Sequence, residues 1–137
     1  MTVESDEELR SILEETQTIA VVGCSTSPAK AAHDVPRFLR EHGYEILPVN
    51  PYAEEIFGRP AADSLADVEE SIDLVDVFRP SEEVGGIVDA AIEREDCGVV
   101  WTQLNIRDDA AAARAEDAGK RVVQDRCLKI EYDRLLG

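Results

Sequence analysis

The chain has 137 residues, a length typical of one domain, and no apolar run long enough to span a bilayer. Its formal net charge of -16 argues against nucleic acid and anionic membranes as partners, because both repel an acidic surface. The acidic N-terminus does not resemble a secretory signal, so a cytoplasmic protein is expected. Abundant carboxylates beside few lysines are typical of extreme halophiles, and we favour such an origin over a mesophilic acidic protein.

The predicted elements alternate along the chain between helix and strand. Ser5 and Glu8 fit a capping box that begins a helix within residues 1–17, ahead of a core of residues 18–137. The core is expected to contain, in order, a strand at 18–22, a helix from near Asp34 with Pro36 in its first turn, a strand at 45–49, a short edge strand near 56–57, a helical turn from 64, a strand at 73–78, a helix capped by Ser81, a strand at 98–103, a helix at about 108–117, a strand at 121–124 and a helix at 129–136. This order predicts a single α/β domain over residues 1–137. It would be an open, doubly wound parallel sheet of about five strands with helices on both faces.

The cysteines and histidines do not form a recognisable reactive or metal-binding pattern. Cys24, Cys97 and Cys127 are widely spaced and include no C-x-x-C pair, which disfavours a disulfide framework and a zinc site. His33 and His42 have no cysteine or carboxylate at convincing ligand spacing, so no metal site is predicted. Catalysis by Cys24 or Cys127 is disfavoured because no histidine lies at a predicted position to serve as their base.

The first predicted strand of the core runs directly into a loop of small residues. Gly23 allows a sharp turn, and Ser25, Thr26 and Ser27 follow it with hydroxyl groups before a helix begins. A strand, a glycine turn and a helix N-terminus form the arrangement that receives a phosphate in nucleotide-binding folds. The loop lacks the G-x-G-x-x-G pattern, so an empty tight turn remains an equal alternative from this loop alone.

Cations follow several other strands, at the edge of the sheet where a ligand binds in open α/β folds. Lys30, Arg79 and Arg126 favour a phosphorylated ligand. Phe78 is equally consistent with closing the end of the sheet, and Arg79 with pairing to a nearby carboxylate. Pairing with Asp125 is the favoured role of Arg126.

The residues after the second core strand disfavour NAD as the ligand. A dehydrogenase of this fold class places an acidic residue there to hold the ribose hydroxyls. This chain has Val49, Asn50 and Pro51 at that position. Binding of an NAD(P)-type dinucleotide, in a redox-sensing role, remains the alternative.

A set of ordered landmarks resembles the stand-alone CoA-binding domain proteins, which are similar to the N-terminal domain of the succinyl-CoA synthetase alpha chain. The resemblance extends from about residue 19 to residue 132. The landmarks are residues 21–25 with Pro28 and Lys30, 43–44 leading to 48–51, Gly58, 64–65, 72–79, Trp101 with Gln103, and 125–131. The resemblance implies a Rossmann-like sheet that binds coenzyme A, free or acylated, across its strand ends.

The same resemblance implies which residues contact the ligand. Loop 23–27 and Lys30 would meet phosphates, residues 49–51 would flank the nucleotide, and residues 78–80 would lie along the ligand toward the pantetheine. The expected site consists of Gly23, Cys24, Ser25, Thr26, Ser27, Lys30, Val49, Asn50, Pro51, Phe78, Arg79, Pro80 and Gln103. The chain departs from the ligases at residues 52–54, where they carry a lysine, and from close relatives at Ala32, where a serine is common.

The resemblance also bears on catalysis and partners. In the ligases, the phosphorylated histidine and the nucleotide-activating groups lie in further domains, which this sequence does not include. We therefore expect a binding module without catalysis of its own. Whether it associates with a second copy of itself or with an enzyme remains open.

Overall fold

The computed structural model describes residues 2–137 as an α/β fold. The strands are β1 (Thr18–Val22), β2 (Glu45–Val49), β3 (Glu55–Ile56), β4 (Arg59–Pro60), β5 (Leu74–Val77), β6 (Val99–Thr102) and β7 (Arg121–Val123). The helices are α1 (Asp6–Glu15), α2 (Ala31–Glu41), α3 (Ser81–Ile92), α4 (Asp109–Asp117) and α5 (Leu128–Leu135), with a short 3-10 helix, η1 (Leu65–Asp67). Five parallel strands form one sheet in the order β2-β1-β5-β6-β7, and β3 pairs with β4 in a small hairpin.

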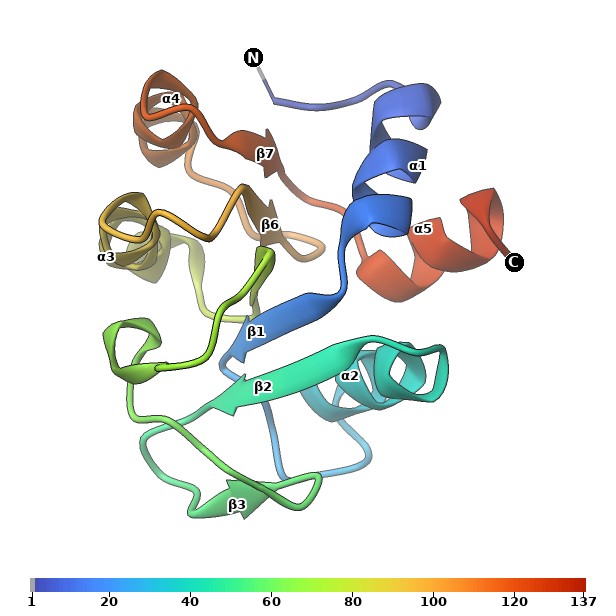
Figure 1. Ribbon diagram of the computed structural model, residues 1–137, viewed down its shortest axis with the longest axis vertical. Helices are drawn as coiled ribbons and strands as arrows, with labels where there is room; N and C mark the ends of the chain where they lie inside the picture. Colours follow the sequence, from blue (N-terminus) through green and yellow to red (C-terminus); the bar gives the residue numbers. More distant parts are fainter. Residues whose placement is uncertain (1) are drawn as a thin grey trace.

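Helices cover both faces of the sheet (Figure 1). Helices α1, α2 and α5 pack on one face, on the right of the view, and η1, α3 and α4 pack on the other. The central strands are mainly apolar because both of their faces are buried, and Asp76 of β5 is a buried exception. Trp101 of β6 is the largest of the fully buried side chains. The predicted doubly wound, Rossmann-like fold is therefore confirmed.

The chain reverses direction across the sheet between β1 and β5. From β1 it passes through α2 to β2 on one side, and from β5 it passes through α3 to β6 on the other. Strands β1 and β5 are direct neighbours, with Val22 opposite Val77 at their carboxyl ends. The loops that leave these two ends diverge to opposite faces, which opens a crevice between them.

Both edges of the sheet are covered by short pieces of chain. Beside β2, the amide of Ala62 donates to the carbonyl of Pro48 (3.0 Å), and the amide of Asn50 donates to the carbonyl of Ala62 (2.8 Å). Pro48 is tolerated because its missing N–H faces this outer edge. Beside β7, the amide of Val3 donates to the carbonyl of Val122 (2.7 Å). Covered edges protect the sheet from pairing with other chains.

Two local predictions were wrong. Helix α2 begins at Ala31 rather than near Asp34, which places Pro36 inside the helix instead of in its first turn. The N-cap of α3 is Pro80, and the hydroxyl of Ser81 accepts a hydrogen bond from the amide of Arg107 (3.0 Å) instead of capping the helix. Of the helices within residues 2–137, none has the length and apolarity that a membrane crossing requires.

Candidate functional site

A cavity of about 750 Å³ lies at the crevice between the carboxyl ends of β1 and β5. Its walls come from the loops after β1, β2 and β5, from the start of α2, from η1 and its preceding loop, and from one face of α3. The lining residues are Val22, Gly23, Cys24, Ser25, Lys30, Ala32, Val49, Asn50, Pro51, Tyr52, Asp63, Ser64, Leu65, Ala66, Phe78, Arg79, Glu82, Glu83, Gly86, Ile87 and Ala90. The position is the one where open α/β sheets bind their ligands.

At Gly23, the loop after β1 contacts the loop after β5. Its φ is +91°, and a Cβ added there would lie 2.9 Å from Cδ of Arg79 and 3.3 Å from the carbonyl carbon of Phe78. Its amide donates to the carbonyl of Val49 (2.9 Å). A side chain at this position would therefore force the β1 and β5 loops apart, and only glycine permits the observed contact.

Pro36 fixes the loop that follows Gly23. A proline inside a helix cannot donate to the carbonyl four residues earlier, which here is that of Ala32. The amide of Ser25 donates to this carbonyl instead (2.9 Å), and it ties the loop to the first turn of α2. The N-cap residue Lys30 makes no side-chain capping hydrogen bond. Within residues 2–137, the amides of Ala31 and Ala32, the first two of α2, have no hydrogen-bond acceptor and remain available to an anion, whereas that of His33 donates to the carbonyl of Lys30 (3.0 Å).

Asn50 joins the β2 loop to the β1 loop. Its Nδ2 donates to the carbonyl of Cys24 (2.9 Å), and its Oδ1 accepts from the amide of Tyr52 (2.8 Å). Both ends of the Asn50 side chain are therefore engaged within the protein. The turn that it holds presents Tyr52, which is 96% exposed, at the border of the cavity.

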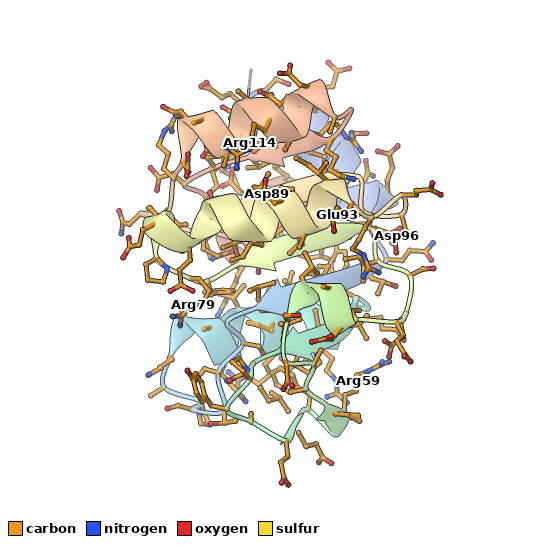
Figure 2. The ribbon with its side chains drawn as sticks, turned by 90° about the vertical axis from the view of Figure 1, so that its left-hand side faces the viewer. Arg59, Arg79, Asp89, Glu93, Asp96 and Arg114 are labelled. Carbon is orange, nitrogen blue, oxygen red and sulfur yellow. The ribbon has the colours of Figure 1, made fainter. Side chains whose placement is uncertain are left out.

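The charged groups of the cavity are unequally paired. Lys30 forms no ion pair within residues 2–137, whereas Arg79 donates through Nε (3.1 Å) and Nη2 (2.8 Å) to the two carboxylate oxygens of Glu83. Figure 2 shows Arg79 at the N-terminal end of α3. The hydrogen bonds from Arg79 lower the pKa of Glu83 below its ordinary value. Asp63 and Glu82 add two more carboxylates to the lining.

The thiol that lines the cavity is not activated. Cys24 is fully buried, and burial, helped by the nearby carboxyl of Asp76, raises its pKa to about 12. A thiol with so high a pKa supplies almost no thiolate at neutral pH, and the thiolate is the nucleophile. Within the described chain, residues 2–137, no group of three or more His, Cys, Asp or Glu side chains could hold a metal ion.

The structure brings most of the predicted site residues together at this cavity. Those that line it are Gly23, Cys24, Ser25, Lys30, Val49, Asn50, Pro51, Phe78 and Arg79. Thr26, Ser27, Pro80 and Gln103 do not line it.

Two residues expected from the β6 and β7 ends lie apart from the cavity. Gln103 is buried, and its Oε1 accepts from the amide of Leu128 (3.2 Å) at the start of α5. Arg126 pairs with Glu131 (2.8 Å), not with Asp125 as expected.

The wall formed by η1 and α3 was not predicted. Asp63, Leu65 and Ala66 lie on one side of it, and Gly86 and Ala90 on the other. The strand ends give no information on this wall, because it comes from residues beyond them. A signal was available in α3, where two small residues four positions apart share one helix face.

Comparison with known proteins identifies the family. The family described as CoA binding domain matches residues 17–133. The uncharacterized protein YneT of Bacillus subtilis is 36% identical over 128 residues, which are 93% of this chain and 94% of YneT. A solved structure from Thermus thermophilus is 43% identical, with a TM-score of 0.91 over 97% of this chain and 100% of that one. The ADP-forming acetate–CoA ligase of Methanocaldococcus jannaschii is 31% identical over 82 residues, which are 60% of this chain and 11% of the ligase. The chain therefore belongs to the CoA-binding domain family.

Proposed function

We propose that the cavity between β1 and β5 binds coenzyme A or an acyl-CoA, and that the chain performs no catalysis of its own. The observation that carries the proposal is the uncapped N-terminus of α2 beside Gly23, with Lys30 unpaired at the same place. Backbone amides and an ammonium group there form a phosphate-binding arrangement. Membership of the CoA-binding domain family supports coenzyme A as the phosphorylated ligand.

The two walls of the cavity suit the two chemical parts of the ligand. The β1 loop and Lys30 offer donors to the phosphates. The opposite wall, with Leu65, Ile87 and Ala90, offers apolar surface to an uncharged part of the molecule. A concave site with apolar walls and a few placed polar groups is typical of cofactor binding.

The side chains of the cavity support a binding role over a catalytic one. Its lining contains no histidine, and its thiol, Cys24, is buried and protonated. The pKa of Glu83 is lowered, whereas a general acid at neutral pH requires a raised pKa. The lining thus lacks an activated nucleophile with its base.

Thermal unfolding with added ligand tests the proposal. A ligand that binds only the folded state stabilises it by RT ln(1 + [L]/Kd), so millimolar CoA should raise the melting temperature. Pantetheine, which lacks the phosphates, should produce a much smaller shift. A folded sample that does not respond to millimolar CoA would overturn the proposal, and a response to NADH alone would select the dinucleotide alternative.

A further inference from the structure

The ion pair between Arg79 and Glu83 lies inside the cavity, where a ligand phosphate would compete for the same arginine. We propose that Glu83 sets the affinity of the cavity for phosphorylated ligands by holding Arg79 in the free protein and yielding it to the ligand. This inference rests on the proposed binding of CoA. It makes Glu83 an affinity-determining residue: it weakens the binding of ligands whose phosphate must take Arg79 from it, and it leaves the binding of ligands without a phosphate unchanged.

The position of Arg79 is fixed by its own side-chain stem. Its Cγ and Cδ lie across Gly23, at 3.3 and 2.9 Å from the point where a Cβ would stand. The stem of Arg79 is therefore held against the β1 loop, and Arg79 lines the same cavity as Lys30 and Ala32 at the start of α2. A ligand phosphate that enters this cavity therefore meets both the start of α2 and Arg79.

The pairing with Glu83 occupies one whole edge of the guanidinium. Nε and Nη2 donate to the two oxygens of the same carboxylate, at 3.1 and 2.8 Å. Phosphate oxygens match this fork in the same bidentate way, so a phosphate can take the place of the carboxylate. Both side chains are about half exposed, at 47% and 45%. Exposed ion pairs contribute little to stability, and exchanging this one leaves the fold intact.

Glu83 opposes the ligand in two ways. It occupies Arg79, and once displaced it remains as a negative charge in a lining that already contains Glu82 and Asp63. Glu82 shares the second effect only, because it lines the cavity without pairing to Arg79. Variants of these two adjacent glutamates therefore distinguish competition for Arg79 from simple charge repulsion of the ligand.

The test compares E83Q with E82Q in the full chain, by calorimetric titration with CoA and with pantetheine. Both variants remove one negative charge from neighbouring positions of one cavity. E83Q should bind CoA about fivefold more tightly than wild type, the scale of an exposed ion pair, and E82Q less than about twofold more tightly. Pantetheine should bind all three proteins equally. In an R79Q background, E83Q should improve CoA binding no more than E82Q does.

The possible failures are distinguishable. If wild type binds CoA and E83Q improves binding no more than E82Q, the competition is absent and this inference alone is overturned. If E83Q weakens binding, Glu83 positions Arg79 for the ligand, which also refutes it. If neither wild type nor E83Q binds CoA while both melt cooperatively, the proposed function itself fails.

Discussion

The buried carboxyl group of Asp76 should make the stability of the fold depend on pH in a defined way. Asp76 lies in β5 between Val21 and Trp101 of the neighbouring strands, and it is 0% exposed. Neither of its carboxyl oxygens has a hydrogen-bond partner within residues 2–137. Burial raises its pKa well above the ordinary value of 3.8, because an ionised carboxylate there would lose its hydration without compensation. Asp76→Asn replaces the group with a neutral amide of similar shape that cannot ionise, so any other effect of the amide is independent of pH.

The sign of the effect follows from which state binds the proton more tightly. The folded pKa is raised, so the stability from the proton on Asp76 is fully present below the unfolded pKa of about 3.8. It is lost as the pH rises from there toward the folded pKa. The free energy of unfolding falls by about 1.4 kcal/mol for each pH unit in this window. Above the folded pKa, Asp76 causes no further fall. The Asn variant lacks this loss. The free energy of unfolding of the variant minus that of wild type should therefore be lowest at pH 3.5 and grow steadily through the window.

Urea unfolding of both proteins at half-unit steps from pH 3.5 to 8 measures this difference directly. Other carboxylates titrate equally in the two proteins and cancel in the difference, and Cys24, with a pKa of about 12, stays protonated throughout. Asp117→Asn, at an exposed position of α4, controls for loss of one charge and should give a curve parallel to wild type. Parallel curves for wild type and Asp76→Asn would refute the reasoning.

Substitutions at three positions of the cavity, and one control outside it, test the site. Gly23→Ala should lower the free energy of unfolding by about 1–2 kcal/mol, measured in urea, because its Cβ meets Arg79 and its φ is positive; unchanged stability would contradict the observed contact. Lys30→Glu should weaken CoA binding about tenfold with little change in melting temperature. Arg37→Glu, the same reversal outside the cavity lining, should leave the affinity nearly unchanged, and equal losses would mean that Lys30 acts only through net charge. Gly86→Ala should stabilise α3 by about 0.5–1 kcal/mol because open space surrounds the new Cβ. Gly86→Leu should place a bulky side chain in the cavity and weaken CoA binding, and full retention of CoA binding by that variant would place the ligand elsewhere.

Much of the fold was predictable because its strands are buried on both faces. The run at Thr18–Val22 is continuous and apolar, and the structure gives the predicted bounds. The start of α2 was harder to predict, because Lys30 makes no side-chain capping hydrogen bond that a sequence pattern could indicate. Pro36 was placed in the first turn, where its missing N–H normally has no consequence. In the structure, the amide of Ser25 replaces that missing donor through a contact between the loop after β1 and the first turn of α2, which no local pattern encodes.

The candidate site was predictable only where the backbone alone creates it. The glycine turn at Gly23 is visible as a motif, and the structure places it at the centre of the cavity. The role of Arg79 left two alternatives, ligand contact and pairing with a carboxylate, and the structure shows the pairing with Glu83. Asp76 has no signal of its own, since one carboxyl inside an apolar strand does not reveal whether a partner faces it.

Strand order explains why only part of the sheet edge forms the cavity. The sequence predicts parallel strands whose carboxyl ends meet at one edge, but it does not state which ends border the crevice. In the order β2-β1-β5-β6-β7, the crevice opens between β1 and β5, where the helices diverge. The ends of β6 and β7 are joined to each other instead. The hydroxyl of Thr102 accepts from the amide of Asp125 (3.2 Å), whose carboxylate accepts from the amide of Asn105 (2.6 Å).

Arg126 follows β7 and is therefore excluded from the cavity together with that strand end. Of the three cations that follow the strand ends, only Lys30 and Arg79 line the cavity. Glu83 engages Arg79, so the free cavity offers one unpaired cation within the described residues. In a chain with a formal net charge of -16, an anionic ligand must then gain its affinity from contacts at close range. The release of a single arginine can for that reason change the affinity measurably, although the ion pair that holds it lies at the surface.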